Sequence, residues 1–281
     1  MNVAVLGAGA WGTAIAATLA PRHSVVLYAR SSEQCAQMAR ERVNARYLPQ
    51  VPLPDSLDFT DDAAKAIAQA NLILIATPTD ALRSMLRAVC PVASPIAWLC
   101  KGFERSSEQL PHQIVQQECG TLDNAGPLSG PSFALEVARG LPTALTVAGN
   151  AEFCELVTET MHGAALRIYS TDDVIGVEVG GAVKNVLAIA TGISDALELV
   201  LNARAALITR GLAEMTRLGV ALGGRAETFM GLTGIGDLIL TATGELSRNR
   251  QVGLAIGRGA SAAAAVKQSA HVVEGVRSAN A

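Results

Sequence analysis

The stretch "VAVLGAGAWGTAIAATLA", residues 3–20, predicts the fold of the N-terminal part of the chain. It opens with a short β-branched, apolar run and continues with Gly7, Gly9 and Gly12 in a G-x-G-x-x-G spacing. Gly7 permits a tight turn, Gly9 lets the backbone approach a pyrophosphate, and Gly12 allows close packing of helix on strand. The helix start that follows presents free N–H groups to phosphate. The order strand, motif, helix favours a dinucleotide-binding unit over a glycine turn of another α/β fold.

Further short apolar runs alternate with helix-like segments such as "DDAAKAIAQA" (61–70). Continuous apolar runs are typical of strands that are covered by helices on both faces. The sequence therefore predicts a doubly wound, Rossmann-type α/β sheet. The runs are "SVVLYA" (24–29), "NLILIATP" (71–78), "PIAWLCKG" (95–102), "TALTVAG" (143–149) and "LRIYS" (166–170).

The second half of the chain has a different character. From Asp173 onward the pattern is helical or glycine-punctuated, without a convincing strand. We therefore expect a dinucleotide-binding domain over residues 1–172 and an all-α substrate domain over residues 173–281. No Pro- or Ser-rich linker marks the boundary, which predicts that the two parts pack directly on each other.

Composition and charge exclude several classes of function. Half of the 281 residues are hydrophobic, and the net charge of −3 is spread without long runs of one sign. This pattern does not favour a nucleic-acid partner or an anionic membrane surface. Neither the five cysteines nor the four histidines have zinc-ligand spacing, so we expect no metal site.

The cysteines and the N-terminus bear on the compartment. We interpret the thiols as buried and free in a reducing compartment. The N-terminus lacks the basic region of a signal peptide, and no apolar run of membrane-spanning length is free of Gly, Pro or charge. We therefore expect a cytoplasmic protein without a membrane span.

The end of the second expected strand bears on the choice of cofactor. An NAD site usually places an acidic residue there to bind the ribose, but this chain has Arg30. A guanidinium suits a 2′-phosphate, which favours NADP(H) and leaves NAD(H) possible. Two alternatives stay open: Glu33 serves the ribose instead, or Arg30 is a solvated loop charge.

One lysine interrupts the small-residue stretch "EVGGAVKNVLAIATGI", residues 178–193. If this stretch is a helix, no residue three or four positions from Lys184 is a carboxylate. Apolar surroundings lower the pKa of an ammonium toward the range of an acid–base catalyst. The alternative is a lysine that extends to solvent. Asn185 adds a neutral donor and acceptor beside it.

Two segments of the first half carry further polar candidates. Lys101 follows an expected strand at the carboxyl edge of the sheet, where doubly wound folds bind ligands. In "LSGPSFALEVARG", residues 128–140, Gly130 and Ser132 lie at a turn before a helix, with Ser132 a plausible N-cap. Ordinary capping and surface charge would explain either segment taken alone.

The second half adds an anion seat and a carboxylate. Ser247 begins a helix and is followed by Arg248 and Asn249, and a helix N-terminus with a guanidinium and an amide suits a phosphate. Asp237 follows a Gly-x-Gly turn. It either complements the helix dipole, binds a substrate hydroxyl or orients Lys184.

Taken together, these residues resemble the NAD(P)-dependent glycerol-3-phosphate dehydrogenases of the bacterial type. The resemblance covers nearly the whole chain, and nine segments match the family pattern in order. They are "GAGAWGTAIA" (7–16), "NARYLP" (44–49), "KGFE" (101–104), "SGPSFALEV" (129–137), "GGAVKNVLAIATGI" (180–193), "NARAALITRGLAEM" (202–215), "GLTGIGDLILT" (231–241), "SRNR" (247–250) and "VVEGV" (272–276).

The resemblance implies interconversion of dihydroxyacetone phosphate and sn-glycerol 3-phosphate, which feeds phospholipid synthesis, by a homodimer. It implies that Lys184 is the catalytic proton donor and acceptor. The implied substrate ligands are Lys101, Gly130, Ser132, Lys184, Asn185, Asp237, Ser247, Arg248 and Asn249. The implied cofactor contacts are Gly7, Gly9, Ala10, Trp11, Gly12, Arg30, Tyr47, Lys101, Ala134, Arg248, Val272 and Glu274.

The chain departs from this family in two places. The family usually has glycine where this chain has Ala196 and Val200, which puts the local geometry in doubt. Family members also usually continue with further helix beyond the position of Ala281. We therefore expect a weaker substrate domain, closed state or dimer.

Three alternatives remain at this point. A 3-hydroxyacyl-CoA dehydrogenase would need a histidine with a carboxylate partner, and no histidine here lies in such a motif. A 6-phosphogluconate dehydrogenase also uses a lysine, but the segment from Ser247 to Arg250 argues against it. A non-catalytic NADP-binding module would bind the cofactor without turnover.

Overall fold

The computed structural model describes residues 1–121, 123–269 and 273–279. The chain forms two compact units: the first comprises Met1–Cys100, His112–Leu128 and Ser132–Asp172, and the second comprises Lys101–Pro111, Ser129–Pro131 and Asp173–Ala281. Two short segments of the first 172 residues, which follow strands of the sheet, thus group with the second unit.

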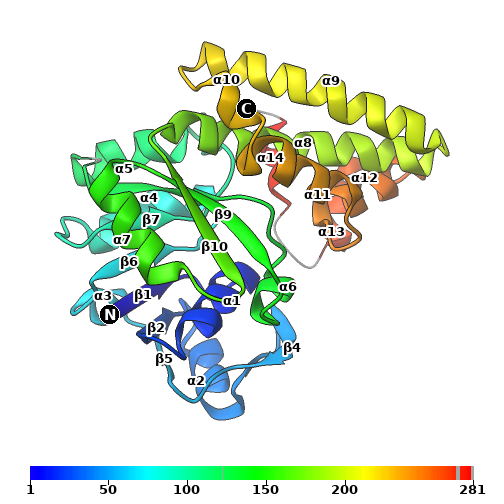
Figure 1. Cartoon of the computed structure of the whole chain (residues 1–281). Helices are drawn as coiled ribbons and strands as arrows, with labels where there is room; N and C mark the ends of the chain where they lie inside the picture. Colours follow the sequence, from blue (N-terminus) through cyan, green and yellow to red (C-terminus); the bar gives the residue numbers. More distant parts are fainter. Residues whose placement is uncertain (122, 270–272, 280–281) are drawn as a thin grey trace. The chain divides into compact units, whose positions relative to one another are not determined.

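An eight-stranded sheet forms the centre of the first unit (Figure 1). Strands β5, β2, β1, β6, β7 and β8 follow one another across the sheet and pair in parallel, and β9 pairs in parallel with β10. All four residues of β6 are buried, as expected of a strand covered on both faces. In sheet order the strands are β10 (Leu166–Thr171), β9 (Thr143–Ala148), β8 (Ala125–Ser129), β7 (Ile96–Trp98), β6 (Leu72–Ile75), β1 (Asn2–Leu6), β2 (Ser24–Tyr28) and β5 (Leu57–Thr60).

Helices connect these strands, which confirms the predicted doubly wound architecture. Side-chain caps begin three of them: Ser31, Asp62 and Asn150 each accept a hydrogen bond from a first-turn backbone N–H. The helices are α1 (Ala10–Leu19), α2 (Ser32–Glu41), α3 (Ala63–Ile67), α4 (Thr79–Val89), α5 (Pro111–Cys119), α6 (Ala134–Ala138) and α7 (Ala151–Met161).

A small antiparallel hairpin, β3 (Val43–Asn44) with β4 (Leu48–Pro52), lies outside the main sheet. Its Asn44 is buried, and its Nδ2 donates to the Ala8 carbonyl at 3.0 Å and to Thr13 Oγ1 at 2.8 Å. The hairpin therefore fixes the glycine loop between β1 and α1. The sequence reasoning did not predict this hairpin.

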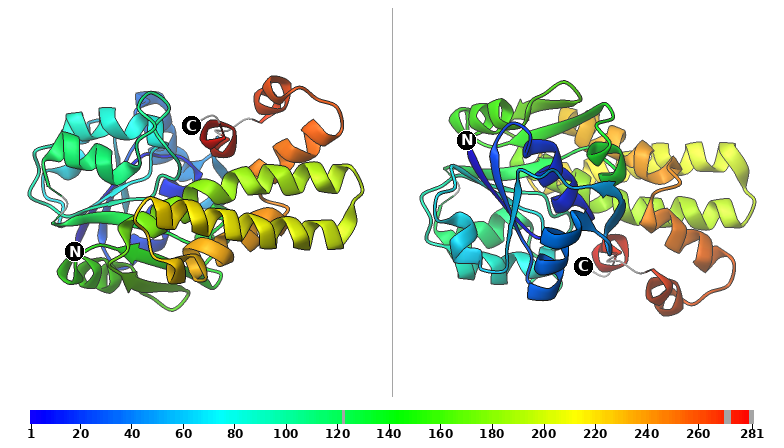
Figure 2. Two further views of the ribbon diagram at one scale, coloured as in Figure 1. Left: turned by 90° about the horizontal axis from the view of Figure 1, so that it is seen from above. Right: turned by 90° about the horizontal axis from the view of Figure 1, so that it is seen from below.

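The second unit is helical over its described residues beyond Asp173, as predicted. Its two long helices, α8 (Val174–Ala196) and α9 (Val200–Ala221), lie side by side in both views of Figure 2. Val179, Met215 and Phe229 are fully buried in a core that these helices share with shorter ones. The others are α10 (Ala226–Phe229), a π-helical turn η1 (Leu232–Gly236), α11 (Asp237–Thr243), α12 (Arg248–Gly257), α13 (Ala262–Gln268) and α14 (Glu274–Ser278).

Helix α8 is the one helix in the described part of the chain that is long and apolar enough to cross a membrane. Most of it is buried inside the protein, and it carries the buried polar side chains of Lys184 and Asn185. These features are those of a core helix.

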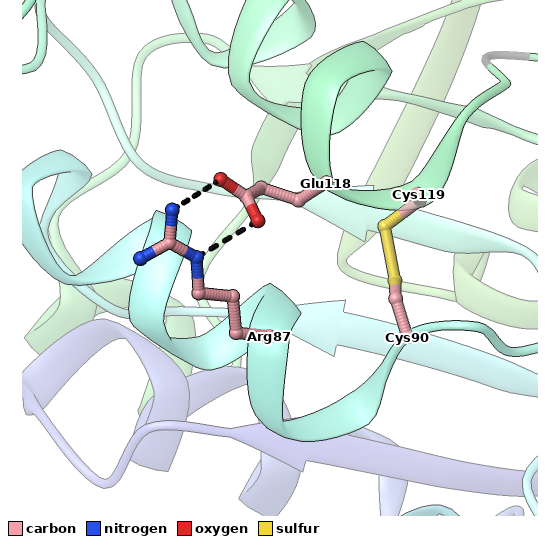
Figure 3. The surroundings of a disulfide bond; sticks show 4 residues. All are labelled: Arg87, Cys90, Glu118 and Cys119. Atoms are coloured by element: carbon pink, nitrogen blue, oxygen red, sulfur yellow. Dashed lines mark hydrogen bonds and ion pairs between the residues drawn. A yellow bond between two sulfur atoms is a disulfide. The ribbon is translucent and has the colours of Figure 1, made fainter.

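The interpretation of all cysteines as free thiols is wrong for two of them. Cys90, at the end of α4, forms a disulfide with Cys119, at the end of α5 (Figure 3). The two helix ends converge, and the Cα atoms of Cys90 and Cys119 are 5.6 Å apart. The adjacent Glu118 carboxylate accepts hydrogen bonds from Nε and from a terminal nitrogen of Arg87. The 29-residue separation hid this proximity from the sequence analysis.

The first residue of α9 is strained. Val200 has a φ of +52°, in the left-handed region that β-branched residues rarely adopt. It is one of the two positions where glycine was expected from the family resemblance. At the other, the Ala196 Cβ lies so close to Gly257 that a Cβ added there would be 2.6 Å away.

We predict that Val200→Gly stabilises the chain by about 1 kcal/mol, because glycine adopts positive φ without strain. Little packing is lost, since Val200 is 66% exposed. Urea unfolding measures the gain. Val200→Ala is the control and should give a smaller gain because it keeps the Cβ. A loss of stability in Val200→Gly would contradict the claim that Val200 is strained.

Candidate active site

Lys184 lies in the middle of α8 and is 7% exposed. Its Nζ donates to Asp237 Oδ1 at 2.5 Å and to Thr241 Oγ1 at 2.9 Å. Both partners are on α11, so the ammonium has no carboxylate partner on its own helix but a buried one on the neighbouring helix. The structure thus excludes a lysine that extends to solvent.

A second lysine shares the same carboxylate. Lys101 Nζ donates to Asp237 Oδ2 at 2.7 Å and to the Gly130 carbonyl at 3.3 Å. Gly130 has a φ of +145°, a conformation that favours glycine. Asp237 is 1% exposed, and each of its oxygens accepts a hydrogen bond from one ammonium group. Its position is compatible with two of the three roles left open by the sequence: it complements the dipole of α11 at the start of that helix, and it orients Lys184.

Local structure explains how Asp237 and Thr241 reach Lys184 together. They are four residues apart on α11 and therefore lie on the same face. The Thr241 hydroxyl donates to the Asp237 carbonyl at 2.7 Å, which leaves its lone pair for Lys184. The sequence analysis missed Thr241; its spacing from Asp237 was the available signal.

The charges of this cluster shift the pKa values of its members. Burial, together with the charge of Lys101, lowers the pKa of Lys184 to about 8, against the opposing effects of Asp237 and Glu274. Burial alone would raise the pKa of Asp237, but the ammonium groups of Lys101 and Lys184 outweigh it and hold that pKa below its ordinary value. Lys184 can therefore exchange a proton near neutral pH while Asp237 stays ionised.

A helix N-terminus belongs to the same unit. Ser247 is buried, and its Oγ accepts a hydrogen bond from the Arg250 backbone N–H at 3.2 Å, so it caps α12 as predicted. Arg248 and Asn249 follow in the first turn. This arrangement of free N–H groups, guanidinium and amide can hold an anion.

Small residues let α12 pack closely on α8. A Cβ added at Gly253 or at Gly192 would collide with backbone carbonyls of the facing helix. At the end of α8, Asp195 accepts hydrogen bonds from both Arg250 and Arg204, with Nε distances of 2.9 Å and 2.8 Å. The glycines of the lysine-bearing stretch thus bring the α12 N-terminus close to α8.

Glu274, at the start of α14, joins this cluster. Its Oε2 accepts a hydrogen bond from Asn185 Nδ2 at 3.2 Å. Burial raises the pKa of the Glu274 carboxyl, against the opposing charges of Lys101, Arg248 and Lys184. The structure therefore groups Lys101, Gly130, Lys184, Asn185, Asp237, Ser247, Arg248, Asn249 and Glu274 in one unit.

The glycine loop of the first unit has the geometry that the sequence predicts. Gly7 has a φ of +122°, and a Cβ there would lie 2.9 Å from the Ala76 carbonyl oxygen. A Cβ at Gly12 would collide with the Gly7 carbonyl, whereas Gly9 has open space around it. The loop thus combines a tight turn, a close helix–strand contact and an approachable backbone, which suits a pyrophosphate.

The remaining predicted cofactor contacts of the first unit lie on several of its elements. Ala10 and Trp11 begin α1, Arg30 is exposed just beyond β2, and Tyr47 lies in the hairpin turn. Ala134 begins α6 and packs against the core of the first unit. Gln34 was missed: its Nε2 donates to the Ala8 carbonyl at 2.9 Å within the loop.

Ser132 is not the N-cap of the following helix; that position belongs to Phe133, because α6 begins one residue later than the turn pattern indicates. Val272 lies outside the described residues.

Family models match both parts of the chain. The model of the NAD-dependent glycerol-3-phosphate dehydrogenase N-terminus matches residues 2–154, and that of the C-terminus matches residues 173–281. Curated relatives named glycerol-3-phosphate dehydrogenase [NAD(P)+] include those of Herminiimonas arsenicoxydans, 58% identical, and Paucimonas lemoignei, 57% identical. The alignments cover all of this chain and 86% of each relative.

Solved structures of the same kind are also similar. A glycerol-3-phosphate dehydrogenase from Coxiella burnetii is 44% identical with a TM-score of 0.94, over 99% of this chain and 87% of that one. The corresponding yeast enzyme is 27% identical with a TM-score of 0.82, over 98% of this chain and 86% of that one. These matches decide against the hydroxyacyl-CoA and 6-phosphogluconate alternatives.

We predict that Asp237→Asn destabilises the chain by about 3 kcal/mol or more, because two buried ammonium groups lose their common counter-charge. Urea unfolding at neutral pH measures the loss. Glu214→Gln is the matched control: the exposed Glu214 side chain pairs with the exposed Arg210 of the same helix, α9, at 3.4 Å, and its loss should change stability by less than about 1 kcal/mol. Equal effects of the two substitutions would contradict the account.

Proposed function

We propose that this chain, which belongs to the NAD-dependent glycerol-3-phosphate dehydrogenase family, interconverts dihydroxyacetone phosphate and sn-glycerol 3-phosphate with NAD(P)(H). The single observation that carries the chemistry is the buried Lys184 ammonium, held by Asp237 with a pKa near 8. Such a group donates a proton to an alkoxide and takes it back from an alcohol at moderate pH. The glycerol 3-phosphate produced would supply phospholipid synthesis.

The glycine loop supports the cofactor. A Cβ at Gly7 or Gly12 would collide with neighbouring atoms, whereas the backbone at Gly9 is open to a pyrophosphate. When bound, the nicotinamide supplies or accepts the hydride at C2. The residues of this chain bind the dinucleotide and orient it; Gln34 and Asn44 hold the loop in shape through the Ala8 carbonyl.

The lysine pair supports proton transfer at the C2 oxygen. In the reductive direction the Lys184 ammonium gives its proton to that oxygen and stabilises the charge that develops there. Asp237 stays ionised and keeps Lys184 oriented, while Lys101 adds a second positive charge beside the same carboxylate.

The α12 N-terminus supports binding of the substrate phosphate. Arg248 supplies a guanidinium, and the first-turn N–H groups supply neutral donors. Binding the phosphate there would hold the C2 oxygen in reach of Lys184, which lies in the same unit. We also propose that the chain forms a homodimer in the cytoplasm, as the family resemblance implies.

We predict opposite pH profiles for the two directions. The pKa of Lys184 is about 8, so its ammonium is lost as the pH rises through that value. The kcat/KM for reduction of dihydroxyacetone phosphate should therefore fall above about pH 8, and that for oxidation of glycerol 3-phosphate should rise. Absorbance of the reduced nicotinamide at each pH measures both.

Lys184→Ala should lower the rate by about 10²–10⁴-fold, the usual contribution of a general acid or base. Lys65→Ala, which removes an exposed lysine of α3, is the control and should leave the rate unchanged. If the wild-type chain binds NADPH but does not consume it, the chain is a non-catalytic binding module and the proposed function fails.

We further propose a preference for NADP(H), carried by Arg30. Arg30→Ala should raise the KM for NADPH about tenfold and change the KM for NADH little, because only the former carries a 2′-phosphate. Arg40→Ala, at an exposed position on α2, serves as the control. An equal effect on both cofactors would assign Arg30 to a role other than reading the phosphate.

A further inference from the structure

A chain of hydrogen bonds joins three helices beside the lysine pair. The Gly275 backbone N–H donates to Asn249 Oδ1 at 3.0 Å, and Asn249 Nδ2 donates to Asn185 Oδ1 at 2.9 Å. Asn185 Nδ2 then donates to Glu274 Oε2 at 3.2 Å. The chain starts and ends on α14, and passes through α12 and α8.

The direction of every bond in this chain follows from its two ends. A backbone N–H only donates, so it must face the oxygen of Asn249, whose NH₂ group then faces Asn185. Asn185 must present its oxygen there, which turns its own NH₂ group toward the Glu274 carboxylate. Both amides are buried, at 2% and 9% exposed, so leaving these groups unpaired would be unfavourable.

The backbone of α14 supplies a second, independent observation. A Cβ added at Gly275 would lie 2.5 Å from the Asn185 carbonyl oxygen and 2.8 Å from Asn249 Oδ1. Such distances are not tolerated, so only glycine lets α14 approach α8 and α12 this closely. The contact is therefore specified by backbone shape as well as by hydrogen bonds.

We propose that Asn185 and Asn249 form a two-amide clasp that docks α14 on α8 and α12 and so positions the Glu274 carboxylate near Lys184 and Lys101. Asn185 directly follows Lys184, and Asn249 directly follows Arg248. The clasp makes the two asparagines positioning residues, with Gly275 as the residue that α14 requires. This inference rests on the proposed function only where it concerns catalysis.

The clasp has a consequence for the acid–base chemistry. The charged groups around Glu274 are Lys101, Lys184, Arg248 and, through the lysines, Asp237. The negative charge of Glu274 raises the pKa of Lys184. Displacing α14 should therefore lower the pKa of Lys184, as removing the charge of Glu274 would, and shift the reductive pH profile to lower pH.

Hydrogen exchange on the ligand-free full chain tests the clasp without any assay of activity. In Asn249→Ala and in Gly275→Ala, amides of the 273–279 peptide should exchange about tenfold faster, because each variant breaks a buried bond of the clasp. Glu274→Gln keeps an acceptor for Asn185 and should preserve protection. Gln251→Ala is the control: Gln251 is exposed on the same helix as Asn249 and bonds the Glu245 carbonyl.

Kinetics then test the positioning role. Asn249→Ala, Gly275→Ala and Glu274→Gln should each shift the reductive pH profile of kcat/KM to lower pH. If Asn249 is only a phosphate ligand, Asn249→Ala raises KM, exchange of residues 273–279 is unchanged, and the clasp is overturned. If exchange rises but the pH profile does not move, the positioning role is overturned. A wild-type chain without dehydrogenase activity would refute the proposed function while leaving the exchange result decisive for the clasp.

Discussion

The buried carboxylate of Asp237 is the interaction on which the candidate site depends. Two ammonium groups converge on it, one on each oxygen, with both lysines nearly excluded from solvent. Neither lysine could keep its charge in these surroundings without the carboxylate. Burial, together with the second positive charge of Lys101, nevertheless makes Lys184 easier to deprotonate than an ordinary lysine.

Close helix packing makes that arrangement possible. The small residues around Lys184 let α11 and α12 approach α8, so that groups from three helices meet although they are far apart in the sequence. A Cβ at Gly180 would collide with the Thr233 carbonyl just before α11, and one at Gly253 would collide with the Ile189 carbonyl of α8. The occurrence of one lysine among small apolar residues is thus explained by packing as well as by chemistry.

The sequence predicted the architecture well where its signals are local. The β1–glycine loop–α1 unit has a fixed spacing and a fixed role for each glycine, and the apolar runs of β6 and β7 are unambiguous. Strand β8, "AGPLS", contains glycine and proline and was not recognised. The hairpin of β3 and β4 was also missed because its first strand has two residues. The Cys90–Cys119 disulfide depends on where two helices end, which no local pattern reveals.

The same limit applies to the site. Lys184 was identified because it is unusual in its own segment, and Asp237 and Ser247 because each stands at a turn or helix start. The sequence could not show that Asp237 serves two lysines, or that Thr241 accepts a hydrogen bond from Lys184, because these are contacts between elements. Gly275 likewise lies in a segment that matches the family pattern, but only the structure shows why glycine is required there: the Asn185 carbonyl of α8 faces it closely.

The most direct test of this account is the pKa of Lys184 itself. Nitrogen-15 NMR of lysine side chains in the ligand-free protein, assigned by comparison with Lys184→Arg, would follow its protonation over pH 6–11. The account predicts a titration midpoint near 8, well below the ordinary value of 10.5. A midpoint at or above 10.5 would contradict it, since Asp237 would then stabilise the ammonium too strongly for proton transfer at moderate pH.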